Sequence, residues 1–284
     1  MIATLDAGLA WAPYLTGDHA GVVLAAFRKA VYLQFDNDVV ALVTGGVPPG
    51  PLHLRLSQLP LFKTGDVVEI HPLANGSIQL RSVAQLHSNA HSTWPKPTVR
   101  NASIAKLSES QAEVARGDVV EFDRPRTWMP PTIDGARLRQ VRPAFREAAR
   151  SDLAGSPVIE VARQQLAHHD LAGAAAGLAG LGSGLTPAGD DVLAGILLVG
   201  ALAGDVAANK LALVAKKAQT HDISRAFLRW AALGQSIAPV HQLLAALTEQ
   251  DHPLIERAQM AVASMGATSG ADLLLGIEMA LDAL

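Results

Sequence analysis

The sequence contains no cysteine, few aromatic residues and little net charge. The absence of cysteine excludes disulfide bonds, thiolate metal sites and a cysteine nucleophile, and it is typical of a reducing, cytoplasmic compartment. Lys and Arg number 23 against 26 Asp and Glu. This balance gives no electrostatic footprint for nucleic acid, so we expect no nucleic-acid partner. The first residues carry no basic region and reach Asp6 early, and we therefore expect no signal peptide.

Long apolar runs of the kind that cross a membrane are also lacking. The longest uncharged stretch considered, residues 171–189, contains six glycines and one proline among its 19 residues. We therefore expect no membrane segment. A chain of 284 residues, 49% of them hydrophobic and 17% charged, is long enough to bury a substantial core and to form two domains.

The residue pattern changes character near residue 100. Before it, short segments rich in Val, Ile and Leu are separated by turn signals, and residues 52–56 (LHLRL) show the period of two that is typical of half-buried strands. After it, the pattern is mostly helical, apart from one further candidate strand at 119–123. We predict an α+β fold. It consists of a small antiparallel β-sheet or barrel domain over residues 1–98 and a mainly α-helical domain over residues 99–284.

The helical part contains a glycine-rich segment, residues 180–195 (GLGSGLTPAGDDVLAG), that continues into an apolar run. Thr186 is predicted to be the N-cap and Pro187 the first residue of a buried helix, so that Asp190 and Asp191 lie in its first turn. A helix N-terminus attracts anions, but two carboxylates there repel a naked anion. The segment therefore favours a cation, an N–H donor or an anion bridged by a metal. Its glycine spacing fits neither the P-loop nor the dinucleotide-binding pattern.

The core of this segment recurs 81 positions later. The pattern G-x-D-x-L-x-G-I occupies residues 189–196 and again residues 270–277. A pseudo-symmetric pair of helices would bring their first-turn acids, Asp191 and Asp272, to one pocket. The alternative is that glycine turns with capping acids recur wherever helices begin. Capping explains an acid near each helix start, but it does not explain the matched glycines.

These residues resemble a bacterial family that includes the AllH subunit of oxamate carbamoyltransferase. Residues 182–191 (GSGLTPAGDD) are similar to its G-x-G-P-G-L-T-P-S-G-D-D signature, and residues 220–224 (THDIS) and 266–272 (GATSGAD) follow in the expected order. The chain departs from the signature at Ser183 and Ala188, where the family has proline and serine. The resemblance covers the C-terminal half well and the N-terminal sheet only in general pattern.

The resemblance implies a transferase role in allantoin and purine nitrogen catabolism. N-carbamoyl-2-oxoglycine and phosphate would give oxamate and carbamoyl phosphate, with other protein subunits as partners. Catalytic roles are expected for Asp190, Asp191, Asp272 and His221. The residues expected to bind substrate or phosphate are Gly182, Ser183, Gly184, Thr186, Gly189, Thr220, Ser224, Thr268, Ser269 and Gly270. If a divalent cation such as Mg²⁺ is used, Asp191 and Asp272 are its expected ligands.

Two other functions stay open. The chain can be a non-catalytic subunit that holds a small acid or a partner chain. Such a role would tolerate alanine at position 188. It can also be a divalent-metal hydrolase that uses the aspartates as ligands. In the same way, Thr220 or Asp222 can simply cap a helix, instead of flanking a general base at His221.

Further histidines and arginines have simpler interpretations. Residues 168–170 (HHD) fit a helix end, where histidine suits the helix dipole. His87 and His91 have the i, i+4 spacing of metal ligands, but they lie in a segment without a helical pattern. A basic cluster can bind phosphate or an acidic subunit, or it can be a solvated face. The cluster comprises Arg137, Arg139, Arg142, Arg146 and Arg150.

Overall fold

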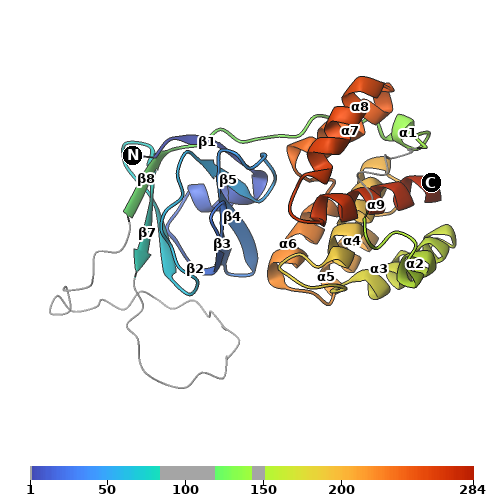
Figure 1. Cartoon of the computed structure of the whole chain (residues 1–284). Helices are drawn as coiled ribbons and strands as arrows, with labels where there is room; N and C mark the ends of the chain where they lie inside the picture. The colour runs from blue at the N-terminus through green and yellow to red at the C-terminus, as the bar shows by residue number, and fades with distance from the viewer. Residues whose placement is uncertain (1, 84–118, 143–150) are drawn as a thin grey trace, which may run out of the picture. The chain divides into compact units, whose positions relative to one another are not determined.

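The computed structural model describes residues 2–83, 119–142 and 151–284, which form two compact units (Figure 1). The first, called the β unit, comprises Met1–Val47 and Leu52–Thr127, and the second, called the helical unit, comprises Pro48–Pro51 and Trp128–Leu284. The predicted α+β class is confirmed. The predicted boundary between residues 98 and 99 lies outside the described residues and stays a prediction. His87 and His91, whose spacing alone suggested a metal site, also lie outside the described residues.

The β unit is an eight-stranded sheet in the order β1-β5-β4-β3-β2-β6-β7-β8. Its strands are β1 (Thr4–Ala7), β2 (His19–Ala26), β3 (Ala30–Phe35), β4 (Asp38–Thr44), β5 (His53–Leu56), β6 (Val67–Pro72), β7 (Ser77–Val83) and β8 (Val119–Asp123). Neighbouring strands are antiparallel except β4 and β5, which are parallel, so the antiparallel prediction is wrong at this one pair. A tight hairpin would force an antiparallel return, whereas the longer connection of residues 45–52 lets the chain re-enter in the same direction.

The sheet of the β unit is nearly closed. Parallel bridges join Ile2 to Phe122 and Ala7 to Thr127, so the edge strand β1 meets the segment that contains β8. Inside the sheet, the 3-10 helix η1 (Leu9–Leu15) buries Trp11, whose indole N–H donates to the carbonyl oxygen of Leu52 at 2.9 Å. The leucines of the 52–56 pattern are fully buried and Arg55 is half-buried, as the period of two predicts, but His53 between Leu52 and Leu54 is also buried.

Helices make up the second unit, and α4 and α9 pack along each other at its centre (Figure 1). The helices are α1 (Gly135–Leu138), α2 (Pro157–Ala167), α3 (Leu171–Leu178), α4 (Ala188–Ala203), α5 (Ala208–Lys217), α6 (Asp222–Ala231), α7 (Ala238–Glu249), α8 (His252–Ala263) and α9 (Ser269–Ala283). Because α4 and α9 are apolar on almost every face, they are buried by their neighbours. Within the described ranges, no helix combines the length and the apolar character needed to cross a membrane.

Two three-helix segments of the helical unit repeat each other at the spacing of 81 residues found in the sequence. The first residues of α2 and α7 are 81 positions apart, and so are those of α4 and α9. Between them, His169 and Gln250 have the same positive φ of 58°. The following residues, Asp170 and Asp251, cap α3 and α8 in the same way, each accepting a hydrogen bond from the N–H three positions on. The duplication therefore extends well beyond the glycine-aspartate motif.

The first glycine of each motif lies against the end of the preceding helix. A β-carbon on Gly189 would lie 2.1 Å from the carbonyl oxygen of Leu178, at the end of α3. The corresponding atom on Gly270 would lie 1.8 Å from the carbonyl oxygen of Val262, near the end of α8. No side chain fits at either position, so both glycines are required by close backbone packing.

The second glycine of each motif lies where α4 and α9 cross. A β-carbon on Gly195 would lie 2.5 Å from the carbonyl oxygen of Leu273, and one on Gly276 would lie 1.9 Å from the carbonyl oxygen of Val192. The two helices therefore meet backbone to backbone, which is possible because neither glycine has a side chain. This crossing fixes the relative position of the two helix N-termini.

Candidate functional site

Helix α4 begins one residue later than the sequence suggested. Its first residue is Ala188 and Pro187 occupies the N-cap, so the predicted capping role of Thr186 is wrong. The Thr186 hydroxyl instead donates to the Asp191 carboxylate and lies 3.3 Å from the Ser269 hydroxyl. Asp190 and Asp191 do lie in the first turn of α4, as predicted.

Asp190 is buried and its carboxylate is fully occupied by protein donors. One oxygen accepts the Gly180 N–H at 2.8 Å, and the other accepts the hydroxyls of Thr220 and Ser224, the latter at 2.6 Å. Thr220 and Ser224 thus belong to a cluster that ties the start of α6 to the glycine loop. These contacts position the loop, while the catalytic role expected of Asp190 stays a prediction.

His221 is the N-cap residue of α6, and its side chain is exposed. Neither Thr220 nor Asp222 caps the helix through its side chain; Asp222 pairs with Arg225 at 2.6 Å. In the part of the chain that the structure describes, no hydrogen bond or ion pair joins the His221 imidazole to Asp191 or Asp272. The catalytic role expected of His221 therefore has no supporting contact among the described residues and stays a prediction.

Asp191 and Asp272 occupy the same position in the first turns of α4 and α9, and they lie close enough to interact electrostatically. Asp191 accepts hydrogen bonds from the hydroxyls of Ser269 and Thr186. Asp272, only 1% exposed, accepts from the hydroxyls of Ser151 and Thr268. In each acid the Oδ2 atom is buried and has no hydrogen-bond partner within the described residues. Two neighbouring carboxylates therefore offer one unused acceptor each.

The environment of the pair favours the protonated form of each carboxyl group. Burial, together with the nearby charges of Asp272 and Asp190, raises the pKa of Asp191 to about 8 even though two hydroxyls donate to it. Burial also raises the pKa of Asp272, helped by the charge of Asp152 and opposed by the hydroxyls of Ser151 and Thr268. A carboxyl group that titrates near neutral pH is suited to acid–base work.

The glycine loop before α4 presents free backbone donors. Gly182 and Gly184 have φ of 112° and 97°, a region that favours glycine, and the loop tip is exposed. Among the described residues, no protein acceptor takes the N–H groups of residues 182–186. These donors lie five to nine residues before Asp191 in the chain. Free N–H groups in such a loop can bind an anion or stabilise a developing oxyanion.

The remaining predicted residues lie at the two turns. Gly189 and Gly270 are buried packing glycines, whereas Thr268 and Ser269 begin α9 beside Asp191 and Asp272. Ser183 is exposed in the loop and has no contact with either acid within the described ranges. The described residues contain no group of three or more His, Cys, Asp or Glu side chains able to hold a metal ion. The aspartate pair thus has no third acidic or histidine ligand there.

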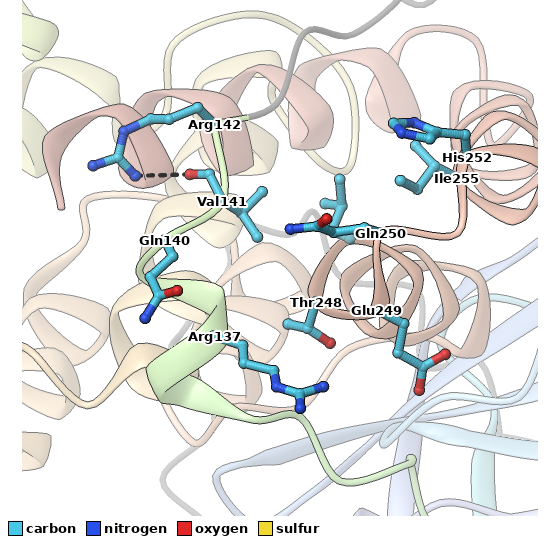
Figure 2. Close-up of a pocket in the computed structure, with 10 residues that line it drawn as sticks. Arg137, Gln140, Val141, Arg142, Thr248, Glu249, Gln250, His252 and Ile255 are labelled. Carbon is cyan, nitrogen blue, oxygen red and sulfur yellow. Dashed lines mark hydrogen bonds between the residues drawn. The ribbon is translucent and has the colours of Figure 1, made fainter.

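Two arginines of the expected basic cluster, Arg137 and Arg142, line a hollow in a different part of the unit. This hollow of about 480 Å³ lies between residues 137–142 and residues 247–255 (Figure 2). Arg142 donates to the carbonyl oxygen of its neighbour Val141 at 2.8 Å, and Arg137 pairs with Asp134 at 3.5 Å. Both cations therefore already have acceptors. Arg139 donates to the carbonyl oxygen of Ala203 at the end of α4, while Arg146 and Arg150 lie outside the described residues.

Sequence reasoning missed Ser151, a buried member of the site. Its hydroxyl donates to Asp272, and its oxygen accepts the Leu153 N–H at 3.0 Å. It lies 121 positions before Asp272, in a segment without a recognisable motif. The contact between Ser151 and Asp272 depends on tertiary structure, so the sequence alone does not reveal it.

Comparisons with known proteins agree with the resemblance seen in the motifs. No curated protein and no solved structure was found to be similar to the chain. A family model does match, over a segment that starts at the last residue of α3 and runs almost to the end of α9. Residues 178–281, which contain both glycine-aspartate turns and the acid pair, match the family of the oxamate carbamoyltransferase subunit AllH, as the sequence predicted.

Proposed function

We propose that this protein is an AllH-type carbamoyltransferase subunit that binds its carbamoyl substrate between the N-termini of α4 and α9. The observation that carries the proposal is the pair of unpartnered, buried Oδ2 atoms on Asp191 and Asp272. A buried acceptor without a partner is costly, and a donor from a bound substrate would relieve that cost. The name of the matching family, an oxamate carbamoyltransferase subunit, supports an N-carbamoyl amide as that donor.

The donors and acceptors around the pair suit the phosphorolysis of such an amide. The substrate presents N–H groups, which the two carboxyl groups accept. Phosphate attacks the carbamoyl carbon, and the carbonyl oxygen develops negative charge that backbone N–H groups stabilise. The free N–H groups of residues 182–186 are the donors proposed for this oxygen or for phosphate. Asp191 titrates near neutral pH, so it can move the proton that the leaving amide nitrogen needs.

We infer that the reaction proceeds without Mg²⁺; if the ion is used, Asp191 and Asp272 are the residues that would hold it. Proteins bind Mg²⁺ through one or two carboxylates together with substrate phosphate and water. Because the pKa values of both acids are raised, Mg²⁺ would have to displace a proton in order to bind. We expect turnover to persist after exhaustive chelation. Loss of turnover on chelation, with recovery on adding Mg²⁺, would favour the metal-dependent alternative.

The function is tested by combining the purified protein with the other subunits of the enzyme. The assay measures carbamoyl phosphate formed from N-carbamoyl-2-oxoglycine and phosphate, with each subunit omitted in turn. We expect phosphate-dependent turnover only when this protein is present. Inactivity in every mixture would contradict the proposal.

One observation favours a second candidate function, that of a non-catalytic subunit. Ala188, the first residue of α4, has no hydroxyl where the family signature has serine. A binding subunit would tolerate this loss. In that case Asp191→Asn and Asp272→Asn would weaken subunit assembly or ligand binding and leave the rate of the assembled enzyme unchanged at saturating substrate.

A further inference from the structure

Ser269 occupies the same place in the second turn as Ala188 does in the first. Both are the first residue of a central helix, and they are 81 positions apart. Ser269 therefore supplies a hydroxyl that its counterpart lacks. It is half-buried, and its hydroxyl lies beside Asp191, the acid of the other repeat, and 3.3 Å from the Thr186 hydroxyl.

The surroundings of this hydroxyl are those of an activated nucleophile. Asp191 becomes increasingly ionised as the pH approaches its pKa of about 8, and this carboxylate form can accept the hydroxyl proton as a general base. The first turn of α9, a helix of 15 residues, favours negative charge developing on Ser269. The fully buried Asp272 adds an unpartnered Oδ2 in the same turn, which is an independent sign that a donor from a ligand belongs there.

Thr186 provides the other hydroxyl beside Asp191, and its Oγ1 atom lies 3.3 Å from the Oγ atom of Ser269. It carries a secondary hydroxyl, which is more hindered, and it lies in the loop before α4 and not in the first turn of a helix. Ser269 is therefore the better nucleophile of the two. Thr186 is placed to hold the Asp191 carboxylate in position.

We propose that Ser269 is a catalytic nucleophile that carries the carbamoyl group as a covalent ester, with Asp191 as its general base. This inference rests on the proposed function. The Ser269 oxygen bonds to the carbamoyl carbon and passes its proton to Asp191. The bond from that carbon to the amide nitrogen breaks, and the nitrogen takes the proton from Asp191, releasing the free amide. A phosphate oxygen then attacks the same carbon, the ester bond breaks, and the phosphate proton returns through Asp191 to Ser269.

The assembled enzyme tests the covalent step when phosphate is left out. We expect N-carbamoyl-2-oxoglycine to release at most one equivalent of oxamate per chain and to leave a carbamoyl group on the peptide that contains Ser269, detected by mass spectrometry. Added phosphate should then release this carbamoyl group as carbamoyl phosphate.

Ser269→Ala should abolish the adduct and turnover. The control is Ser264→Ala, which removes an exposed hydroxyl bonded to the carbonyl of Ala261 and should change neither. Turnover of Ser269→Ala within about threefold of the parent would overturn the inference and leave the proposed function intact.

Cyanate gives a second test that needs neither the native substrate nor the partner subunits. A hydroxyl adds to isocyanic acid by forming a bond from oxygen to carbon, while its proton moves to nitrogen. We expect the isolated full chain to be carbamoylated at Ser269 faster than at Ser264, and Asp191→Asn to remove the difference. If the lysines react and Ser269 stays unmodified, the nucleophile assignment is wrong whatever the enzyme's native reaction.

Discussion

Gly195 of α4 and Gly276 of α9 meet backbone to backbone: a β-carbon on Gly195 would lie 2.9 Å from the carbonyl carbon of Gly276. Four residues before each glycine stands an acid of the candidate site, Asp191 and Asp272. Four residues correspond to about one helical turn. The glycine crossing therefore sets the spacing of the acid pair, and it links the packing of the core to the chemistry proposed for the site.

The crossing predicts that Gly276→Ala is strongly destabilising. The added methyl group would lie 1.9 Å from the carbonyl oxygen of Val192, so the two backbones must separate. We expect a loss of about 3 kcal/mol or more in the free energy of unfolding, measured by urea denaturation of the full chain. The matched control is Gly177→Ala in α3, where the new atom meets only a Val158 methyl at 3.9 Å. Helix propensity there predicts a gain of up to about 1 kcal/mol. Equal stabilities of the two variants would show that α4 and α9 do not cross this closely.

The raised pKa of Asp191 predicts a dependence of stability on pH. Between the ordinary value of 3.8 and about 8, the unfolded chain loses this proton while the folded chain keeps it. Folding is therefore increasingly disfavoured by this group as pH rises through that window. Asp191→Asn removes the penalty, and we expect it to stabilise the chain at pH 8.5 by on the order of 2 kcal/mol. One pKa unit corresponds to about 1.4 kcal/mol, and structural relaxation reduces the full effect.

The control for this measurement is the same comparison at low pH. Near pH 4 the parent carboxyl group is protonated in the folded chain, so Asp191→Asn and the parent should differ little in stability. A variant that is less stable than the parent by the same amount at both pH values would contradict the raised pKa of Asp191.

Asp190 and Asp191 are adjacent, and the contacts predict opposite effects on stability. Asp190→Asn keeps the shape but loses the charge that accepts from Gly180, Thr220 and Ser224. The substitution also replaces one acceptor oxygen with an amide NH₂ group, which would face the N–H or hydroxyl donors of these residues. We expect a loss of about 2 to 4 kcal/mol in the free energy of unfolding and faster amide hydrogen exchange around Gly180.

Asp222→Asn is the matched control for Asp190→Asn. It removes an exposed carboxylate whose partner is Arg225, and exposed ion pairs contribute little. We expect a change of less than about 1 kcal/mol. If Asp190→Asn were equally mild, the anchoring role of Asp190 would be wrong.

Much of the fold was predictable from local patterns, while a few elements were not. Alternation in residues 52–56 predicted a strand, and the apolar run after Asp191 predicted a buried helix. Strand β2 was missed because its sequence, HAGVVLAA, shows no clean alternation. Its Gly21 is instead required by the close approach of Gln34 and Phe35, which a sequence alone does not reveal.

The candidate site was predictable where the chain repeats itself. The matched glycines pointed to the pairing of Asp191 and Asp272 and to residues beside it such as Ser269. The rest of the duplication was hidden because α8 has 12 residues and α3 has 8, while the loop before α9 is correspondingly shorter. The different contacts of the two first-turn acids of α4 could not be predicted. Two partners of Asp190 come from a distant part of the chain, Thr220 just before α6 and Ser224 within it.

The central claim is that the acid pair between α4 and α9 is where carbamoyl transfer takes place. Its most direct test is the rate of phosphate-dependent carbamoyl phosphate formation by the assembled enzyme containing Asp272→Asn, with Asp222→Asn as the control. We predict a loss of about 100-fold or more for Asp272→Asn, with assembly retained, and no significant loss for Asp222→Asn. Full activity of a correctly assembled Asp272→Asn enzyme would contradict the account.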